Sequence, residues 1–298
     1  MFLAVMAIFL LYGAFFLIFE DYGLRTWSPM GNALDWHLLW GSIVVMALLA
    51  LLLHRYARRM DERISREQAE QQNAMRRQLT QNITHELKTP VASIMGYTET
   101  LLAHPDIDAA TRQQFIERTH VQAQRLIMLL QDITLLNRMD YAAEYLVRER
   151  IDVASIVADV VEEMAVVAAQ RRVAIHNCLP QDIGIIGVES LVCSIFRNLL
   201  ANAVNYAGED SIVVLRAVEQ PTAWQFSVSD NGVGIAAEHL PHIFERFYRI
   251  DKGRSREQGG SGLGLAIVKN AVVQHGGTIA AEPNQPHGIS FIFTLQKK

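Results

Sequence analysis

The stretch that decides the fold is TQNITHELKTPV, residues 80–91, which places a histidine five residues ahead of a proline in a run that otherwise predicts helix. Apolar residues recur along this run at spacings of three and four, which predicts one buried helical face. The members of this stripe are Leu79, Ile83, Leu87, Val91, Ile94, Tyr97 and Leu101. At about 100° per residue, His85 points roughly 170° away from the centre of the stripe. We therefore expect its side chain to lie outside the core.

The neighbours of His85 favour covalent chemistry over metal binding. A helical metal site needs a second His, Cys or carboxylate one turn further on, and those positions hold Lys88 and Thr89. Glu86 can instead accept a proton from one ring nitrogen and leave the other nitrogen as a nucleophile. Pro90 cannot donate to the carbonyl group four residues before it. We expect a kink or local loosening there, within a helix that continues because the apolar stripe stays in phase.

A second helical run follows at about 109–139, after a turn at 104–108. Its apolar residues also form a stripe: Ile116, Ala123, Leu126, Leu130 and Ile133. Two amphipathic helices joined by a short loop make an αα-hairpin. Such a hairpin cannot bury both stripes by itself, so we expect two copies to pair as a homodimeric four-helix bundle.

The N-terminal part of the chain is apolar enough to cross a membrane twice. Residues 1–19 are uncharged and nearly as long as the roughly 20 residues of a span, and they lack the basic start and the cleavage site of a signal peptide. A second span is predicted at 38–56, where the cluster Arg55, Arg58 and Arg59 places the following chain in the cytoplasm. Both termini are then cytoplasmic. The loop between the spans, residues 20–37, is too short to fold alone.

Charge and cysteine content argue against two further kinds of site. The chain of 298 residues has 27 Lys and Arg against 31 Asp and Glu, and the net charge of −4 predicts no nucleic-acid binding. The two cysteines, Cys178 and Cys193, lack the CxxC spacing of a metal site, and we expect both to be buried, reduced thiols.

After about residue 150 the pattern changes to alternating helix and strand signals, which favours an α+β sandwich with a mixed sheet. Helices are predicted at 153–170, 189–207 and 262–277. Strands are predicted at 172–177, at 278–281, at 289–295, and as a pair around a Gln-Pro turn within 211–230. The predicted fold is therefore multi-domain, with two transmembrane helices, a helical hairpin and an α+β sandwich.

A row of asparagines marks the long helix of this last section. Asn198, Asn202 and Asn205 follow one another at spacings of four and three, on one helical face. Amides in this pattern serve either as structural caps or as oxygen ligands of Mg²⁺ and contacts to phosphate.

Two glycine-rich stretches add to the asparagine row. DNGVGI, residues 230–235, exposes Asp230 at a strand end, where its carboxylate can accept a hydrogen bond from an exocyclic amine such as that of adenine. GGSGLGLAIV, residues 259–268, puts glycines before a helix whose free N–H groups suit phosphate. A Rossmann site is disfavoured because no βαβ unit surrounds the glycines. The three clusters together predict a nucleotide site.

Taken in this order, the motifs resemble those of the sensor histidine kinases of two-component systems, over roughly residues 70–298. THELKTP is similar to the H box of that family, with His85 at the phosphoacceptor position. NLLANAVNYA is similar to the N box, DNGVGI and GGSGLGLAIV to the two glycine boxes, and IFERFYR (243–249) to the F box, with HGGTI (275–279) after them. The stretch from the F box onward looks most like the phosphate-responsive sensor kinases.

The resemblance implies a dimerisation and phosphotransfer hairpin at 57–145 and a Bergerat-type ATP-binding domain at 146–298. It implies that Asn202 ligates Mg²⁺ and that Asp230 accepts from the adenine amine. The positions that match nucleotide contacts of the family are Asn198, Asn202, Asn205, Tyr206, Asp230, Gly232, Gly234, Ile235, Phe247, Lys252, Arg254, Gly260, Gly262, Leu263, Gly264, Leu265 and Thr278.

For two parts of this implied site, the resemblance leaves the contacts to phosphate open. Residues 250–261 match the family's mobile lid, in which Lys252 and Arg254 either reach phosphate or form a solvated charge run. Asn205 stands where the N box usually carries Lys or Arg, so a cationic phosphate contact is missing or comes from the lid. This departure is expected to weaken ATP affinity without abolishing it.

The resemblance also implies an activity. ATP, bound with Mg²⁺, would phosphorylate His85 with Glu86 as general base. The phosphoryl group would then pass to an aspartate of a response regulator receiver domain, and Thr89 would position water for dephosphorylating that regulator. The location implied is the bacterial cytoplasmic (inner) membrane. Two other classes stay open: an ATPase or chaperone with the same nucleotide fold, and a non-catalytic membrane scaffold.

Overall fold

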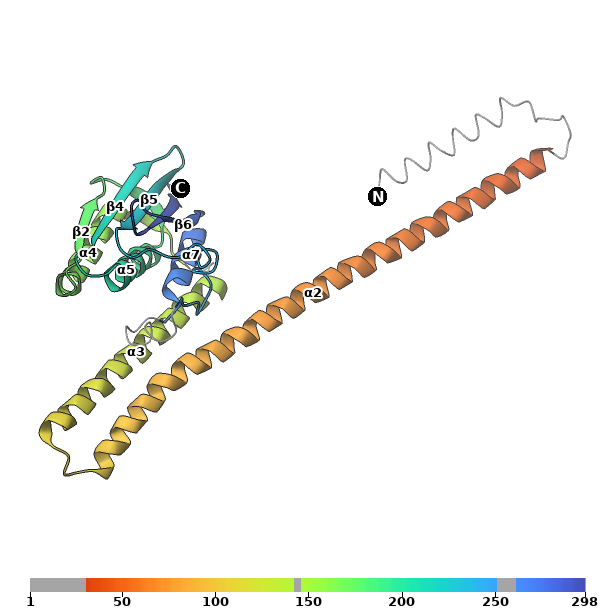
Figure 1. The fold of residues 1–298 in the computed structure, drawn as a ribbon. Coiled ribbons are helices and arrows are strands. Elements are labelled where there is room, and N and C mark those ends of the chain that lie inside the picture. Colours follow the sequence, from red (N-terminus) through yellow and green to blue (C-terminus); the bar gives the residue numbers. More distant parts are fainter. Residues whose placement is uncertain (1–30, 142–145, 251–260, 298) are drawn as a thin grey trace. The chain divides into compact units, whose positions relative to one another are not determined.

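The computed structural model describes residues 31–141, 146–250 and 261–297 (Figure 1). The chain divides into two units, Met1–Arg76 and Arg77–Lys298. The second unit holds a helical hairpin and an α+β domain, which confirms the multi-domain organisation predicted from the sequence.

Helix α2, Gly31–Ala103, is one long helix that passes Pro90 without ending. Its stretch Gly41–Ile64, of 24 residues and mean hydropathy 1.4, is long and apolar enough to cross a membrane, and it is the single such stretch among the described residues. The span predicted at 1–19 lies outside them. Residues 31–37, the end of the predicted loop, are helical, because no proline or glycine after Gly31 interrupts them; the loop between two spans stays a prediction.

Helix α3, Ala109–Tyr141, follows the predicted turn and completes the hairpin with the end of α2. Tyr97 and Phe115 stack across the two helices, with ring centroids 5.6 Å apart. In the single chain, Ile116 and Leu130 of the predicted stripe are 49% and 48% exposed; the sequence assigns burial of the stripes to pairing with a second copy, and this expectation for α3 stays a prediction. The buried residues of α3 are Leu129, Leu136 and Met139. Helix α3 also packs against helix α7, Gly264–Gln274.

The α+β domain is built on a five-stranded sheet in the order β2-β4-β5-β7-β6. Strand β2 runs parallel to β4 and the other neighbours are antiparallel, so the sheet is mixed as predicted. The strands are β2 Ala174–Cys178, β4 Ile212–Glu219, β5 Ala223–Asp230, β6 Ile279–Pro283 and β7 Ile289–Gln296. The Gln-Pro turn between β4 and β5 is where the sequence places it.

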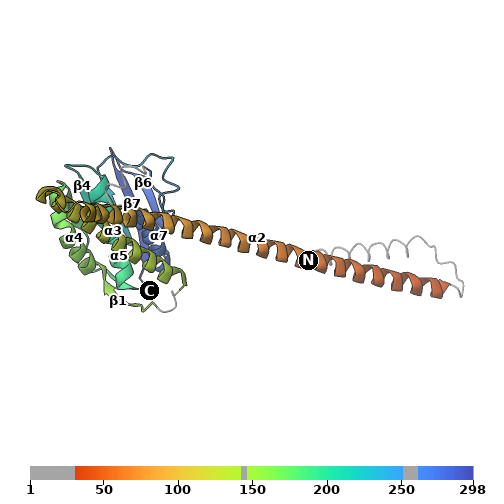
Figure 2. The same cartoon turned by 90° about the horizontal axis from the view of Figure 1, so that it is seen from below.

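Three helices pack on one face of this sheet (Figure 2). They are α4 Val153–Gln170, α5 Glu189–Tyr206 and α7. Alternate residues of β5 and of most of β7 are buried, as are Val213 and Leu215 of β4. The rings of Phe196, Phe226 and Phe293 meet at centroid distances of 5.3–5.6 Å in the core. Full burial of each such side chain contributes about 1.5–3 kcal/mol. This core holds α5 and α7, which carry the asparagine row and the second glycine-rich motif, against the sheet.

Two features of this domain differ from the sequence prediction. A small second sheet pairs β1, Glu149–Asp152, with β3, Gly184–Gly187, and it was not predicted. Both cysteines are free thiols, but only Cys193 is partly buried. Cys178 is exposed, which corrects the expectation of burial, because it ends β2 at the edge of the sheet.

Candidate active site

The imidazole of His85 projects from α2 into solvent, as the phase of the apolar stripe predicts. Its ring forms no hydrogen bond or ion pair with any described residue. One turn further on, Thr89 is also exposed, and its hydroxyl donates to the backbone carbonyl of His85 at 3.3 Å. A phosphoryl group can reach this imidazole, because the ring is exposed and its nitrogens are not engaged in hydrogen bonds with described residues.

Glu86 has a different environment from its neighbour His85. Its side chain is 18% exposed, and Oε2 lies 3.5 Å from Nη1 of Arg249 and 4.0 Å from Nη2 of Arg125. Arg125 belongs to α3 of the hairpin, whereas Arg249 comes from the α+β domain. Sequence reasoning singled out neither arginine as a site residue, although Arg249 is the last residue of the IFERFYR motif.

The asparagine row is presented by α5, whose other side is anchored in the core by Leu199, Leu200 and Ala203. Asn198 donates from Nδ2 to the carbonyl of Ser194 at 2.9 Å, so its Oδ1 faces away from its own helix turn.

The next two members of the row are half-buried. The side chain of Asn202 forms no hydrogen bond with any described residue, so its amide oxygen is available to a ligand. The backbone carbonyl of Asn205 accepts from Nη1 of Arg171 at 3.4 Å. Sequence reasoning did not single out this arginine, which brings a cation close to the position where Lys or Arg was expected.

Asp230 ends β5 as predicted, but at 6% exposure it is buried and not exposed, because β5 lies inside the sheet between β4 and β7. Its Oδ1 accepts from the backbone N–H of Gly232 at 2.9 Å. Burial raises the pKa of this carboxyl above its ordinary value, while hydrogen bonds from the backbone N–H groups of Gly232 and Ile289 lower it. A buried carboxylate with remaining acceptor capacity is suited to a donor such as an exocyclic amine.

The backbone around Asp230 is packed too closely for side chains. A Cβ at Gly232 would lie 2.3 Å from the carbonyl oxygen of Ala207 at the end of α5. A Cβ at Gly288 would lie 1.9 Å from the carbonyl oxygen of Asp230, and Gly234 has a φ of +71°. Sequence reasoning missed Asn231, whose Oδ1 accepts from Ile212 N at 2.7 Å and fixes the start of the loop.

The second glycine-rich motif forms the turn that leads into α7. Gly262 has a φ of +70°, and its carbonyl accepts from the backbone N–H of Phe247 at 2.8 Å. Helix α7 has no side-chain cap at its N-terminus, which leaves backbone N–H groups for an anionic ligand. A Cβ at Gly264 would lie 2.6 Å from Oδ1 of Asn198, so this turn and the asparagine row meet at one place.

The remaining predicted residues, apart from Thr278, fall into four groups by their exposure. Tyr206 is 42% exposed at the end of α5, and Ile235, Phe247 and Leu265 are half-buried. Leu263 is completely buried in the core, so its side chain serves packing. Residues Lys252, Arg254 and Gly260 lie outside the described part of the chain.

Thr278 is not brought to the other predicted residues. It is exposed, and its backbone N–H donates to Oγ1 of Thr294 at 3.0 Å. Thr294 pairs with Gln225 of β5, toward the opposite end of that strand from Asp230.

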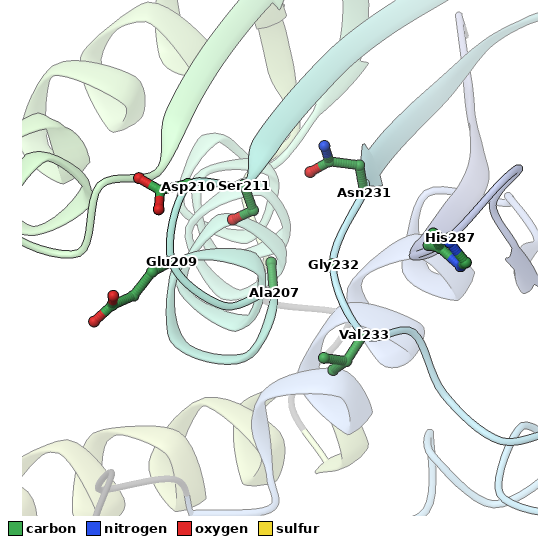
Figure 3. Close-up of a pocket in the computed structure, with 8 residues that line it drawn as sticks. All are labelled: Ala207, Glu209, Asp210, Ser211, Asn231, Gly232, Val233 and His287. Atoms are coloured by element: carbon green, nitrogen blue, oxygen red, sulfur yellow. The ribbon is translucent and has the colours of Figure 1, made fainter.

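A cavity of about 340 Å³ lies beside the loop after Asp230 (Figure 3). It is lined by Ala207, Glu209, Asp210, Ser211, Asn231, Gly232, Val233 and His287. Of the predicted nucleotide contacts only Gly232 is among these residues. The cavity is therefore a neighbour of the site built from Asn198, Asn202, Asp230 and Gly264.

The residues of that site fit a magnesium nucleotide. Asp230 offers a buried acceptor for a base, and the uncapped start of α7 offers N–H donors for phosphate. Mg²⁺ is usually held by one or two protein oxygens together with substrate phosphates, and the free amide oxygen of Asn202 supplies such a ligand. Mg²⁺ bound there would neutralise phosphate charge.

Comparisons with known proteins match both parts of the second unit. Residues 75–142 match the model of the His Kinase A (phospho-acceptor) domain. Residues 187–298 match the model of the histidine kinase-, DNA gyrase B- and HSP90-like ATPases.

Curated relatives and solved structures agree with these matches. The sensor-like histidine kinase SenX3 of Mycobacterium tuberculosis is 35% identical over 74% of this chain and 54% of its own length. The phosphate regulon sensor protein PhoR of Haemophilus influenzae is 33% identical over 75% of this chain and 52% of its own. The chain thus spans about half the length of these relatives. The structure of ShkA in complex with AMPPNP is 26% identical, with a TM-score of 0.53 over 71% of this chain and 44% of ShkA.

Proposed function

The chain belongs to the sensor histidine kinases of two-component systems, and from this premise we propose that it transfers the γ-phosphoryl group of ATP to His85 and passes it to an aspartate of a response regulator. The observation that carries the proposal is that one chain holds both reactants' sites. An exposed imidazole stands beside a carboxylate on the hairpin, and Asp230, Asn202 and the start of α7 form a nucleotide-type site on the α+β domain.

In the proposed reaction, a ring nitrogen of His85 attacks the γ-phosphorus of ATP. The bond between that phosphorus and the bridging oxygen breaks, a P–N bond forms, and ADP leaves. Glu86 accepts the proton of the other ring nitrogen. Catalysis comes mainly from positioning and from neutralising phosphate charge. Asp230 would hold the base, and Asn202 would hold the Mg²⁺ that accompanies the phosphates.

The second half of the proposal concerns the response regulator. Phosphohistidine donates its phosphoryl group to an aspartate carboxylate of the regulator's receiver domain. Thr89 lies one turn beyond His85 on the same exposed side of α2, where its hydroxyl can position the water that later hydrolyses the aspartyl phosphate. The chain would therefore both phosphorylate its regulator and dephosphorylate it.

The proposal also includes dimerisation and attachment to the membrane. A second copy of the chain would cover the apolar side chains that the hairpin leaves exposed, which include Val91, Met95, Ile116, Ile127 and Leu130. The stretch Gly41–Ile64 would anchor the dimer in the bacterial cytoplasmic membrane, together with the predicted span at 1–19, with both termini and the catalytic parts in the cytoplasm.

The test is incubation of the full chain in detergent or nanodiscs with γ-labelled ATP and Mg²⁺. A label that is lost in acid and kept in alkali, and is absent from His85→Gln, supports the kinase. His104→Gln serves as matched control, because His104 is an exposed histidine of the same hairpin. ATP hydrolysis without protein label would support an ATPase instead, and absence of nucleotide binding would support a scaffold.

A further inference from the structure

The carboxylate of Glu86 is held between two arginines while the imidazole beside it is left alone. Oε2 of Glu86 lies 3.5 Å from Nη1 of Arg249 and 4.0 Å from Nη2 of Arg125. The three side chains are 18%, 8% and 15% exposed, in the order Glu86, Arg249, Arg125. Charges so far out of water interact more strongly than surface pairs do. The carboxylate is therefore committed to the arginines, and not to His85.

The two arginines differ in where they come from. Arg125 lies on α3, so it stays near Glu86 whatever the α+β domain does. Arg249 lies on the α+β domain, so its contact with Glu86 exists only while that domain is docked on the hairpin. A carboxylate that has to accept the proton of His85 must be free to turn toward that ring.

We propose that Arg249 is a positioning residue that holds Glu86 away from His85 in the docked arrangement and releases it when the α+β domain moves. This inference rests on the proposed kinase function. It makes the docked arrangement a resting state for autophosphorylation. The position of the α+β domain then determines whether Glu86 is paired with Arg249 or is able to accept the proton of His85.

Other contacts dock the same two parts without touching Glu86. Arg246 donates to Oδ1 of Asp140 at 2.8 Å, and Gln274 donates from Nε2 to the carbonyl of Met139 at 3.1 Å. Loss of either single contact leaves the other docking contacts in place, among them the hydrogen bond from Ser261 to Asp132, so the domain stays docked and the ion pair of Arg249 with Glu86 is kept. Arg246→Gln is therefore a matched control, because it removes an arginine from the same F-box motif and the same interface.

The experiment measures initial rates of autophosphorylation of the full chain over a range of ATP concentrations. Arg249→Gln should raise kcat about fivefold, the low end of coupling between two sites, with KM for ATP unchanged. Arg249→Lys should stay near the wild-type rate because it keeps the charge, and Arg246→Gln should change the rate less than about twofold. In a Glu86→Gln background, whose slow residual labelling is followed over hours, Arg249→Gln should add nothing.

Several outcomes would overturn the inference. A fall in kcat, a changed KM, or an effect that persists without Glu86 would place Arg249 in another role. Equal increases in Arg249→Gln and Arg246→Gln would show that docking as a whole, and not the hold on Glu86, restrains the reaction. Where Arg249→Gln disturbs folding, Arg249→Met removes the charge with similar volume and gives the same test. Failure of the kinase function itself is distinguishable, because the wild-type chain would then carry no label at His85.

Discussion

The hydroxyl of Ser261 donates a hydrogen bond of 3.0 Å to Oδ2 of Asp132, and it thereby joins the glycine-rich turn before α7 to helix α3. The same hydroxyl accepts from the backbone N–H of Leu263 at 3.1 Å. Burial raises the pKa of Asp132, and the hydrogen bond from Ser261 lowers it. One serine therefore both shapes the nucleotide-side turn and donates to a half-buried carboxyl of the hairpin.

Ser261→Ala should weaken docking of the α+β domain by about 0.5–1.5 kcal/mol, because the half-buried Asp132 loses a hydrogen-bond donor. Hydrogen exchange of α3 around Leu129 and Leu136 should become faster in the full chain. Ser194→Ala is the control, since that hydroxyl donates only to the carbonyl of Ser190 in its own helix. Unchanged exchange in α3 would show that the hydrogen bond contributes nothing to docking.

Asp230→Asn should reduce ATP affinity about 10- to 100-fold, the contribution of a hydrogen bond to a charged acceptor. The fold should tolerate the change, because Oδ1 of the new amide can still accept from Gly232 and the charge whose burial raises the pKa is removed. Titration with a fluorescent ATP analogue, alongside hydrogen exchange of β5, separates binding from stability.

Asp230 also makes the stability of the domain and its ATP affinity depend on pH. A raised pKa in the folded state means that the ionised Asp230 opposes folding, so its contribution to stability is present below the ordinary value of 3.8 and is lost as pH rises through the folded pKa. A base that donates to the carboxylate reverses this preference. ATP affinity should therefore fall as pH drops through the raised pKa, and it should do so in the wild type but not in Asp230→Asn.

Gly264→Ala should reduce ATP affinity about tenfold, or about 1.4 kcal/mol, with little loss of stability. The new Cβ would lie 2.6 Å from Oδ1 of Asn198, the end of a short side chain that can turn away from its place in the site. In Gly277→Ala the obstacle is backbone, 1.8 Å away at the carbonyl of Thr294, so that variant should unfold the domain.

The control for both glycine variants is Gly96→Ala. Nothing lies within 4 Å of a Cβ at this helical position, so the variant should gain roughly 0.5–1 kcal/mol from helix propensity. Isothermal titration with ATP and thermal unfolding, measured on the same samples, check all three. A tenfold loss of ATP affinity in Gly96→Ala would mean that the assay reports general disturbance and not the site.

Local patterns predicted the helices and the longer strands well because each carries its own signal. Helix α4 matches its prediction at both ends, and α2 continues past Pro90 as the phase of the apolar stripe required. The exposed position of His85 follows from the same phase. The short strands β1 and β3 were missed because four residues carry too little periodicity, and only their mutual pairing makes them strands.

Contacts between segments far apart in the sequence could not be predicted from the periodicity or motifs of a single segment. The packing of α3 against α7 could not be predicted from the periodicity of α3 alone. The ion pair of Arg249 with Glu86 depends on how two domains dock. Thr278 was carried over from a motif match, and only the register of β7 shows that it lies toward the other end of the sheet from Asp230.

His275 joins α7 to the start of α5 from within the core, where it is 4% exposed. Nε2 accepts from the backbone N–H of Val188 at 3.0 Å, and Nδ1 lies 2.7 Å from the carbonyl oxygen of Ala271. These partners require the neutral ring with its proton on Nδ1. Gly187 leaves room for the ring, since a Cβ there would lie 2.5 Å from Nε2.

Burial, and to a lesser degree the charge of Arg148, lower the pKa of His275 below its ordinary value of 6.5. Its contribution to stability is therefore present above that value and is lost as pH falls through the folded pKa. Protonation would also turn Nε2 into a donor facing the N–H of Val188. Protection factors of the α5 start and the α7 end, which correct for the slower intrinsic exchange in acid, should therefore fall as pH drops below the ordinary value of 6.5 and through the lowered pKa.

His275→Ala should cost about 1–3 kcal/mol at neutral pH, because the N–H of Val188 is left buried without its acceptor. The loss of protection in acid should disappear in this variant, since the titrating group is gone. His176→Gln, at an exposed position of β2, should leave both the stability and its pH dependence unchanged. Persistence of the full acid effect in His275→Ala would assign it to another group.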